Sequence, residues 1–575
     1  MEAKRKYLTV TLLSAAFILC TVFNGGMYWQ HCIIPIALLL ICCLINFMDL
    51  TQGTWLIGLC SIALTVLALL SLISTRGNFQ NGVYECEKLL IFILALYVGK
   101  LFSQRQDIIL RLLVAVSLII SIGGILAYCS IITPSEFIFP DGSLLRLQSF
   151  IKYANTTACL LGCGYYSLLE LEAKHKKVQA LIGAVILMGL WLTFSKACIP
   201  MFLAIAFLII SAKRDCRGFF IIQNVITAVF SVLAAYLASV ELLLPAFISI
   251  CVGIALSSIL TSKIKRDLFK PWTALFIIGI IAGVVLIIIK PSIAITLFKR
   301  WDYSRDALSL IPDSILLGNG PASWRLLQFT SQTTDYFVTL LHNGPLQFAV
   351  EMGIPFTVIF FAVIIFAVIR LIKAGRLAAT ASILLTVLHS SMDLDLSFGI
   401  MLMTVGLLSG TRLEAHKTRL SIISLIPILL ISALTLGYMS TEYIQRSSFE
   451  NLVIAKRFEE AYDKGRRLEA ICPRDPLLQV TLATLEQSTS NDTEIITARL
   501  KRAVDLSPLE PSVYNYYMNY TVTDKSIEEH CAKYQSLMPL QKDTKPTLKA
   551  FIESACQRNV ISSAERDRLL SIYVE

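Results

Sequence analysis

A single histidine at the start of an apolar run is the residue of this 575-residue chain best suited to acid–base chemistry. His342 lies in the segment LLHNGPLQFAVEMGIP, which leads from a polar stretch into an apolar one. An imidazole titrates near neutral pH, so it can accept a proton from a hydroxyl group. His342 and Asn343 could equally form a capping pair at a helix terminus, and the sequence leaves that structural interpretation open.

Four cationic residues accompany this histidine at the ends of apolar runs or in the polar stretches between them: Arg146, Lys196, Arg300 and Arg305. The planar guanidinium group of arginine matches phosphate oxygens, so several such groups together predict an anion site. Two simpler interpretations stay open. Single arginines are tolerated in such loops, and Lys196, in FSKACIP, can extend its side chain to the membrane surface without binding anything.

A second histidine, His389, precedes Asp393 by four residues in LHSSMDLDLSF. Ionisable residues at this spacing inside an apolar run suggest a functional pair, although a purely structural ion pair explains them as well. The stretch before His342 contains a Gly-rich turn, GNGPASW, which is not a phosphate-binding GxxxxGK loop. We expect no metal ion or other cofactor at the candidate site that contains these residues.

The composition places these residues in a membrane protein. The chain is 56% hydrophobic and 16% charged, whereas about a quarter of a soluble domain is charged. We expect an all-α bundle of 14–15 spans, each of roughly 20 residues. The expected spans are residues 7–23, 32–48, 54–74, 88–104, 108–131, 150–170, 178–194, 197–212, 218–239, 241–261, 271–290, 346–370, 377–392, 395–411 and 419–438.

Basic residues predict the orientation of this bundle, because short cytoplasmic loops collect lysine and arginine. With the amino terminus inside, five basic loops fall on the cytoplasmic side: 174–177, 213–217, 263–270, 370–376 and 412–419. The longest loops, 132–149 and 291–345, then lie outside. The net charge of +10 is spread over short loops rather than gathered in one patch, so we expect no nucleic-acid partner.

From Arg446 the chain becomes polar and helix-prone, which predicts a membrane domain over 1–440 and a soluble domain outside the membrane over 446–575. Pro473, Pro508 and Pro539 recur near the 34-residue period of tetratricopeptide helix pairs. We expect helical repeats that bind a protein partner, with a plain helical bundle as the alternative. Most cysteines lie in apolar runs, as Cys159 does, and no CxxC motif occurs. Three tail cysteines could hold one disulfide or stay free: Cys472, Cys531 and Cys556.

The order of these signatures resembles the O-antigen ligase and O-antigen polymerase family over residues 140–410. The matching segments are Arg146 followed by KYANTTA, then FSK, RWDYSRDAL leading to GNGPASW, HNGPLQ followed by EMGI, and HSSMD. The run HN-x(3)-Q-x(3)-E-x-G-I is the most specific of them. The usual Ser-Arg of the family is Ser195-Lys196 here, and lysine keeps the charge but loses the bidentate geometry.

The resemblance implies a metal-independent glycosyltransferase in the cytoplasmic membrane. Its donor would be an undecaprenyl-diphosphate-linked glycan held among membrane lipid, and its acceptor a hydroxyl of a glycan, lipid or protein. His342 would act as general base, and Arg146, Lys196, Arg300 and Arg305 would hold the diphosphate. Supporting roles fall to Asn343, Gln347, Glu351, His389 and Asp393.

Two other function classes compete with this expectation. A transporter or flippase of lipid-linked glycan would have ionisable residues near the membrane midplane and repeated halves with interrupted helices. Here the polar residues collect at one face, and no repeat of the halves is evident in the sequence. A membrane-anchored scaffold that acts through its tail would leave the charged outer loops unexplained.

Overall fold

The computed structural model of this chain describes residues 2–133, 135–142, 144–171, 175–212, 217–263, 292–413, 419–489 and 492–574. The expected span 271–290 lies outside these residues, as do parts of the basic loops around 174, 213–216, 264–270 and 414–418. The described chain is almost entirely helical, as the apolar runs predict. A helix satisfies its backbone hydrogen bonds within one segment, which an apolar run needs in a hydrocarbon environment.

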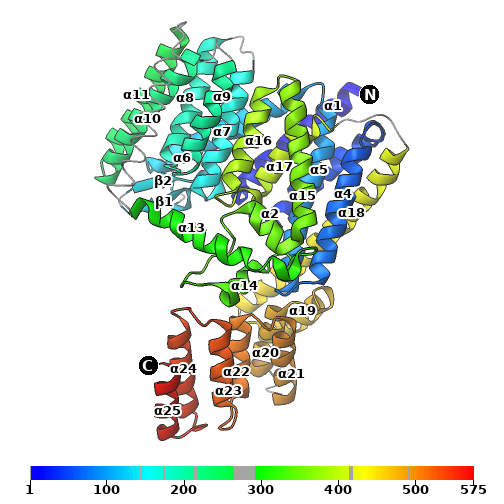
Figure 1. The fold of residues 1–575 in the computed structure, drawn as a ribbon, viewed down its shortest axis with the longest axis vertical. Coiled ribbons are helices and arrows are strands. Elements are labelled where there is room, and N and C mark those ends of the chain that lie inside the picture. Colours follow the sequence, from blue (N-terminus) through cyan, green and yellow to red (C-terminus); the bar gives the residue numbers. More distant parts are fainter. Residues whose placement is uncertain are drawn as a thin grey trace.

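Most of these helices form one apolar bundle (Figure 1). They are α1 (Glu2–Val22), α2 (Trp29–Ile45), α3 (Phe47–Leu50), α4 (Trp55–Ile73), α5 (Phe79–Leu101), α6 (Gln106–Tyr128), α7 (Ala154–Glu170), α8 (Lys176–Leu192), α9 (Cys198–Ala212), α10 (Arg217–Ser239), α11 (Leu243–Lys263), α15 (Gly344–Lys373), α16 (Leu377–Ser390), α17 (Gly399–Gly410) and α18 (Leu420–Ile454). Every expected span within the described residues corresponds to one of them.

Seven helices of the described chain are long and apolar enough to cross a membrane: α1, α4, α6, α10, α11, α15 and α18. Helices α2, α9, α16 and α17 are apolar but shorter. The expectation of 14–15 spans counted these shorter helices and others with more polar residues, such as α5.

Helix α5 begins at Phe79, whereas the expected span begins at residue 88. Asn78 caps the helix, because its side chain accepts hydrogen bonds from the amides of Gln80 and Asn81.

Close helix contacts hold the centre of the bundle together. Helix α5 packs along α17, and Gly99 lies so near that an added Cβ would be 2.2 Å from the carbonyl oxygen of Leu407. Gly410 makes the reciprocal contact, with 2.1 Å from such a Cβ to the carbonyl oxygen of Leu96. Small residues that let two backbones approach are typical of helix packing in membranes.

The expected outer loop 132–149 departs from the all-α expectation, because it contains a short hairpin. Strands β1 (Ile138–Asp141) and β2 (Leu144–Leu147) pair antiparallel, with Phe139 opposite Arg146. Gly142, at the turn, has a φ of 66°, a conformation that glycine adopts without strain. The hairpin precedes α7 and brings Arg146 toward the start of that helix.

The expected outer loop 291–345 is largely helical in its described part. It contains α13 (Ser292–Leu308), a 3₁₀ turn (Pro312–Ser314) and α14 (Trp324–Ser331). In Figure 1, α13 and α14 lie below the bundle, between it and the helices of the tail. A small apolar cluster that includes Trp324, Tyr336 and Leu341 fixes this layer to Val350 of α15.

One continuous helix joins the bundle to the tail. Helix α18 runs from Leu420 to Ile454 and so crosses the expected domain boundary at 440–446. Seven helices follow, each of which contacts the next: α19 (Phe458–Ile471), α20 (Pro476–Thr489), α21 (Thr493–Leu506), α22 (Pro511–Thr521), α23 (Ile527–Leu537), α24 (Thr544–Gln557) and α25 (Ser563–Tyr573). The tail cysteines named above are free thiols.

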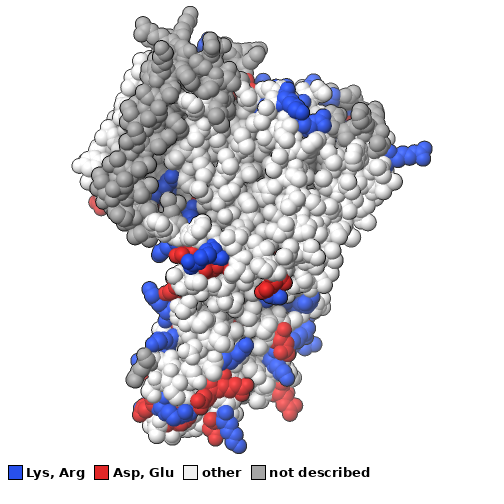
Figure 2. All heavy atoms as spheres, viewed as in Figure 1, with Lys and Arg blue, Asp and Glu red and all other residues white. Residues whose placement is uncertain are grey.

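The tail also contacts the segment 291–345. Gln541 donates a hydrogen bond of 2.7 Å to the carbonyl oxygen of Tyr336, and Arg325 lies 3.9 Å from the buried Glu510. Figure 2 shows the charge distribution on one face. A broad area without charged side chains lies over the centre of the bundle, and acidic and basic side chains mix over the tail. Such an uncharged area is what a membrane-embedded surface requires.

Candidate functional site

The carboxylate of Asp393 lies at the centre of the candidate site. It is fully buried in the connection between α16 and a 3₁₀ turn (Asp395–Ser397). Oδ1 accepts hydrogen bonds from the hydroxyl of Tyr153 at 2.5 Å and the amide of Leu394 at 2.9 Å, and Oδ2 accepts one from Nδ2 of Asn155 at 2.6 Å. A buried carboxylate needs such a set of donors.

Two further groups, both from the segment 291–345, contact the same carboxylate. Nη2 of Arg300, in α13, lies 3.3 Å from Oδ2 of Asp393, and its other terminal nitrogen bonds the carbonyl oxygen of Met392. Nδ1 of His342 lies 3.4 Å from Oδ1. A carboxylate beside Nδ1 favours the tautomer with its proton on Nδ1, which leaves Nε2 free to accept a proton. The His342 side chain is 22% exposed, so part of the ring is accessible.

Arg146 extends the site toward the start of α9. Its Nε donates to the carbonyl oxygen of Thr193 at 2.9 Å, and its Nη2 donates to Oδ1 of Asn155 at 2.7 Å. The Ser195 hydroxyl donates to the same amide oxygen at 2.9 Å. Asn155 therefore joins Arg146 to Asp393, because its oxygen faces the arginine and its nitrogen faces the carboxylate.

Lys196 lies at the outer edge of this group. Its Nζ is 3.6 Å from Oδ2 of Asp141, which is also 3.8 Å from Arg146. The Lys196 side chain is 61% exposed, whereas those of Arg146 and Arg300 are 13% and 18% exposed. Three of the four predicted phosphate-binding cations thus share two carboxylates.

Burial and charge shift the ionisation of the central groups. Burial alone would raise the pKa of Asp393, but the hydrogen bond from His342 and the charge of Arg300 outweigh it and lower the pKa. Burial and the adjacent carboxylate of Asp393 raise the pKa of Tyr153, and burial lowers the pKa of Arg146. Asp393 is therefore an anion at neutral pH, with Tyr153 as a neutral hydrogen-bond donor.

Arg305 lies apart from this group. Its guanidinium is 3.5 Å from Asp302, 3.4 Å from Asp306 and in contact with Thr333. Arg305 follows Arg300 by five residues in α13, so the two side chains leave the helix on different sides. The structure therefore does not join Arg305 to Asp393, and the predicted role of Arg305 in binding the diphosphate stays a prediction.

The residues with a predicted supporting role divide between the site and the packing beneath it. Asn343 caps α15 by accepting a hydrogen bond from the amide of Leu346 at 3.1 Å, so the capping interpretation holds for Asn343 while His342 faces Asp393. Glu351 is buried, and it accepts hydrogen bonds from Nε2 of Gln347 at 3.4 Å and from the amide of Trp324 at 3.3 Å. The latter pair fixes the Gly-rich turn against α15.

The proposed pairing of His389 with Asp393 is corrected by the structure. His389 is fully buried, and its Nδ1 lies 2.5 Å from Oδ2 of Asp395. The hydroxyl of Thr156 donates to the other oxygen of Asp395 at 2.8 Å. Because α16 ends at Ser390, the i, i+4 spacing of a continuous helix does not reach Asp393.

Sequence reasoning missed several residues that complete the site: Tyr153, Asn155 and Thr156, together with Asp141 and Asp395. The first three belong to the KYANTTA segment, which the sequence singled out without assigning roles to its residues. Their signal was a polar run at the start of an apolar helix. The two aspartates carried no spacing signal, since their partners come from distant elements.

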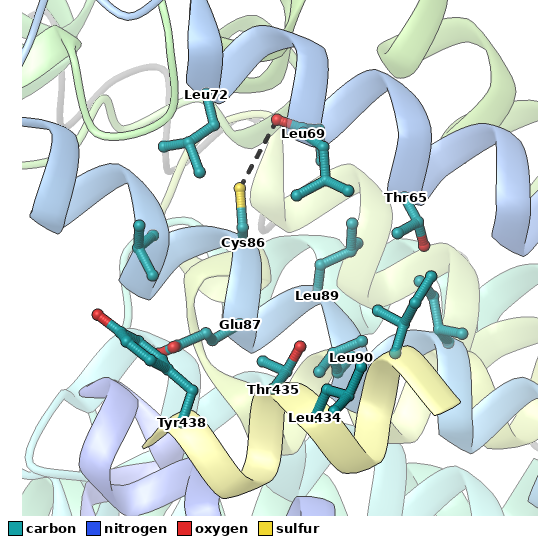
Figure 3. Close-up of a pocket in the computed structure, with 14 residues that line it drawn as sticks. Thr65, Leu69, Leu72, Cys86, Glu87, Leu89, Leu90, Leu434, Thr435 and Tyr438 are labelled. Carbon is teal, nitrogen blue, oxygen red and sulfur yellow. Dashed lines mark hydrogen bonds between the residues drawn. The ribbon is translucent and has the colours of Figure 1, made fainter. Parts of the chain in front are cut away.

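A separate cavity of about 290 Å³ lies between α4, α5 and α18. Figure 3 shows its lining of leucines with Glu87, Thr435 and Tyr438. The thiol of Cys86 donates to the carbonyl oxygen of Ala68 at 3.8 Å, drawn as the dashed line. Glu87 is 3% exposed, and within the described chain neither carboxylate oxygen has a hydrogen-bond partner.

The site thus contains a partly exposed imidazole, that of His342, beside the buried carboxylate of Asp393. Three cations lie near them: Arg300, Arg146 and Lys196. Such a set can remove a proton from a hydroxyl and hold an anion nearby. Comparison with known proteins adds no identification: no protein family, curated protein or solved structure matches this chain.

Proposed function

We propose that this protein transfers a glycan from an undecaprenyl-diphosphate-linked donor to an acceptor hydroxyl at the outer face of the cytoplasmic membrane. The observation that carries the proposal is the meeting of His342 with Asp393 beside Arg300, Arg146 and Lys196. The segments that resemble O-antigen ligases and polymerases contain each of these residues. Two chemical requirements of glycan transfer match this arrangement.

The first requirement is to bind the diphosphate. Lys196 is exposed, and it contacts Asp141 across 3.6 Å at the rim of the site, so phosphate oxygens can replace that carboxylate as its partner. Arg300 and Arg146 are more buried and are fixed by Met392 and Thr193, so they present oriented donors. Cations so placed neutralise the charge that develops on a departing diphosphate.

The second requirement is to activate the acceptor. The acceptor oxygen attacks the anomeric carbon while the bond from that carbon to the phosphate oxygen breaks, and its electron pair leaves with the lipid diphosphate. The hydroxyl proton passes to Nε2 of His342. Asp393 stabilises the imidazolium that forms, because its carboxylate lies 3.4 Å from Nδ1. No step of this scheme assigns a role to a metal ion.

The proposed location follows from the ends of the bundle. Arg5, in α1, pairs with Asp49. Figure 1 marks the amino terminus at the end of the bundle opposite to the tail. The positive-inside rule favours the cytoplasm for the amino-terminal end. The lipid part of the donor would then lie along the apolar, membrane-facing surface of the bundle, with its diphosphate at the level of Arg300. The tail, a proposed extracytoplasmic repeat domain, would cover the outer loop and bind a protein partner.

A reconstituted transfer assay tests this function. Purified protein receives a lipid-diphosphate-linked glycan and candidate acceptors, and product is followed by release of the lipid diphosphate. We expect His342→Ala to lower the transfer rate at least about 100-fold, the usual contribution of a general base. His31→Ala is the matched control, because that ring lies against Phe23 and Tyr28 and is not assigned to the site. Full activity of His342→Ala would remove the base assignment.

A transporter of lipid-linked glycan remains the second candidate, and Glu87 favours it. This carboxylate faces an apolar cavity within the bundle, as ionisable residues of transporters do. Product formation in detergent separates the two functions, because a detergent micelle has no second compartment. Turnover in detergent supports the transferase, whereas movement of the donor across liposomes without turnover supports the transporter.

A further inference from the structure

Three buried side chains from three different helices converge within the bundle. The Sγ atoms of Cys159 in α7 and Cys198 in α9 and a ring nitrogen of His389 in α16 all lie within 4.8 Å of one another. All three residues are fully buried. The sequence gives no hint of this group, because its members are separated by long stretches and form no CxxC motif.

One ring nitrogen of His389 is left without a partner among the described residues. Nδ1 is engaged by Asp395 at 2.5 Å, and Asp395 is itself held by the hydroxyl of Thr156. Nε2 is buried and has no hydrogen-bond partner among the described residues. Histidines that bind metals present one nitrogen to the ion and donate the other N–H to a carboxylate in this way.

The chemistry of the three atoms selects a class of ion. Two sulfurs and one imidazole nitrogen are ligands that Zn²⁺ and Cu⁺ prefer over hard cations such as Mg²⁺. Around an ion with bonds of about 2.0–2.3 Å, ligand atoms are roughly 3.5–4 Å apart. Side-chain movements of under about 1 Å therefore close the observed group on an ion. Two thiolates also balance the charge of Zn²⁺, which favours its burial.

We propose that Cys159, Cys198 and His389 bind a soft metal ion, Zn²⁺ or Cu⁺, as a structural clamp. The ion would tie α7, α9 and α16 together beneath the candidate site. Asn155 and Thr156 begin α7, and Asp393 and Asp395 follow α16, so the clamp would fix both sides of the carboxylate cluster. The clamp supplies no group to the transfer reaction, and the proposal does not depend on that function.

Metal analysis of the purified full-length protein tests the clamp. The protein is produced once with added zinc and once with added copper, and metals are quantified by mass spectrometry after removal of loose ions. We expect about one zinc or copper ion per chain, and the two preparations decide which ion the site prefers. Cys159→Ser and Cys198→Ser should each lower the content at least about tenfold. Cys43→Ser is the matched control, since Cys43 is an equally buried thiol that bonds Leu94 in another part of the bundle.

A measurement on the unaltered chain covers the case in which these variants fold poorly. Removal of the ion with a membrane-permeable chelator should lower the thermal midpoint by several degrees, and the same metal should restore it. Co²⁺ added to the stripped protein should give the thiolate charge-transfer absorption of a cobalt–sulfur site. A purified protein without bound metal that gains none on addition, or one with a disulfide between Cys159 and Cys198, would overturn the proposal.

Discussion

Nδ1 of His342 lies 3.4 Å from Oδ1 of Asp393, although 51 residues separate the two in the chain. The histidine comes from the start of α15 and the aspartate from the connection after α16. Asp393 is also bonded by Tyr153, Asn155 and Arg300. One buried carboxylate thus fixes the direction of the imidazole and the position of a cation. Four predictions concern Asp393, Arg300, Lys196 and Glu87.

Asp393→Asn should destabilise the protein near neutral pH. The amide removes the negative charge between Arg300 and His342, and loss of one partner of a buried ion pair costs about 3 kcal/mol. The pKa of Asp393 is lowered in the folded state, so its contribution is complete above an unfolded pKa of about 4 and is lost as the pH falls through the folded value. Denaturation of wild type and variant across this range should show their difference shrink below about pH 4.

Asp107→Asn provides the control for that experiment. Asp107 is half exposed and lies 3.5 Å from Arg111 on the surface of α6. Removal of an exposed pair of this kind should change the stability by less than about 1 kcal/mol at any pH. A constant difference between wild type and Asp393→Asn over the whole pH range would contradict the ionised carboxylate.

Arg300→Ala should lower the rate of glycan transfer by about 100-fold, because the site loses an oriented donor for the diphosphate. Arg300→Lys should recover part of this loss, since lysine keeps the charge without the planar donor geometry. The neighbouring Lys299 is exposed, so Lys299→Ala controls for loss of positive charge on the same helix. Equal losses in both alanine variants would point to a general electrostatic effect on the donor.

Lys196→Arg should retain or increase activity if this side chain binds the diphosphate. Its Nζ already lies 3.6 Å from Asp141 at the exposed rim, where a guanidinium could contact two phosphate oxygens. Lys196→Ala should raise the KM for the donor more than it changes kcat, because an exposed rim cation contributes mainly to binding. An alanine variant with unchanged kinetics would show that Lys196 only extends to the membrane surface.

Glu87→Leu should raise the thermal midpoint of the protein. Both carboxylate oxygens lack a hydrogen-bond partner within the described chain, and an unsatisfied buried polar group costs on the order of 1–3 kcal/mol. The cavity in Figure 3 is mostly apolar, so leucine suits it. Glu85→Leu is the contrasting change, because Glu85 lies 2.8 Å from Lys88. A Glu87→Leu variant that loses activity while gaining stability would identify Glu87 as functional.

The positions of the helices were largely predictable from the chain. A run such as 218–239 is long and apolar, and its helical state follows from local hydrogen bonding alone. The limits of α5 were not predictable in this way, since its first turns contain Asn81, Glu85 and Glu87. Those polar residues are accommodated by partners or space within the bundle, which hydropathy does not register.

The candidate site was predictable in its residue types and only partly in its arrangement. His342, Arg146, Lys196 and Arg300 stood out because charged and titratable groups are costly beside apolar runs. The sequence did not reveal that Asp393 faces His342 while His389 faces Asp395, nor that Arg305 turns toward Asp306. These partners depend on where α16 ends and how α13 lies across the bundle.

By itself, the sequence determined the helical class, the apolar bundle and the polar tail, because these follow from the local periodicity and hydropathy of each segment. Only the tertiary structure decided which side chains share a carboxylate and which thiols lie beside His389. Those relationships join segments far apart in the chain, and their geometry depends on packing between helices. The sequence order of the segments does not encode the distances that result from that packing.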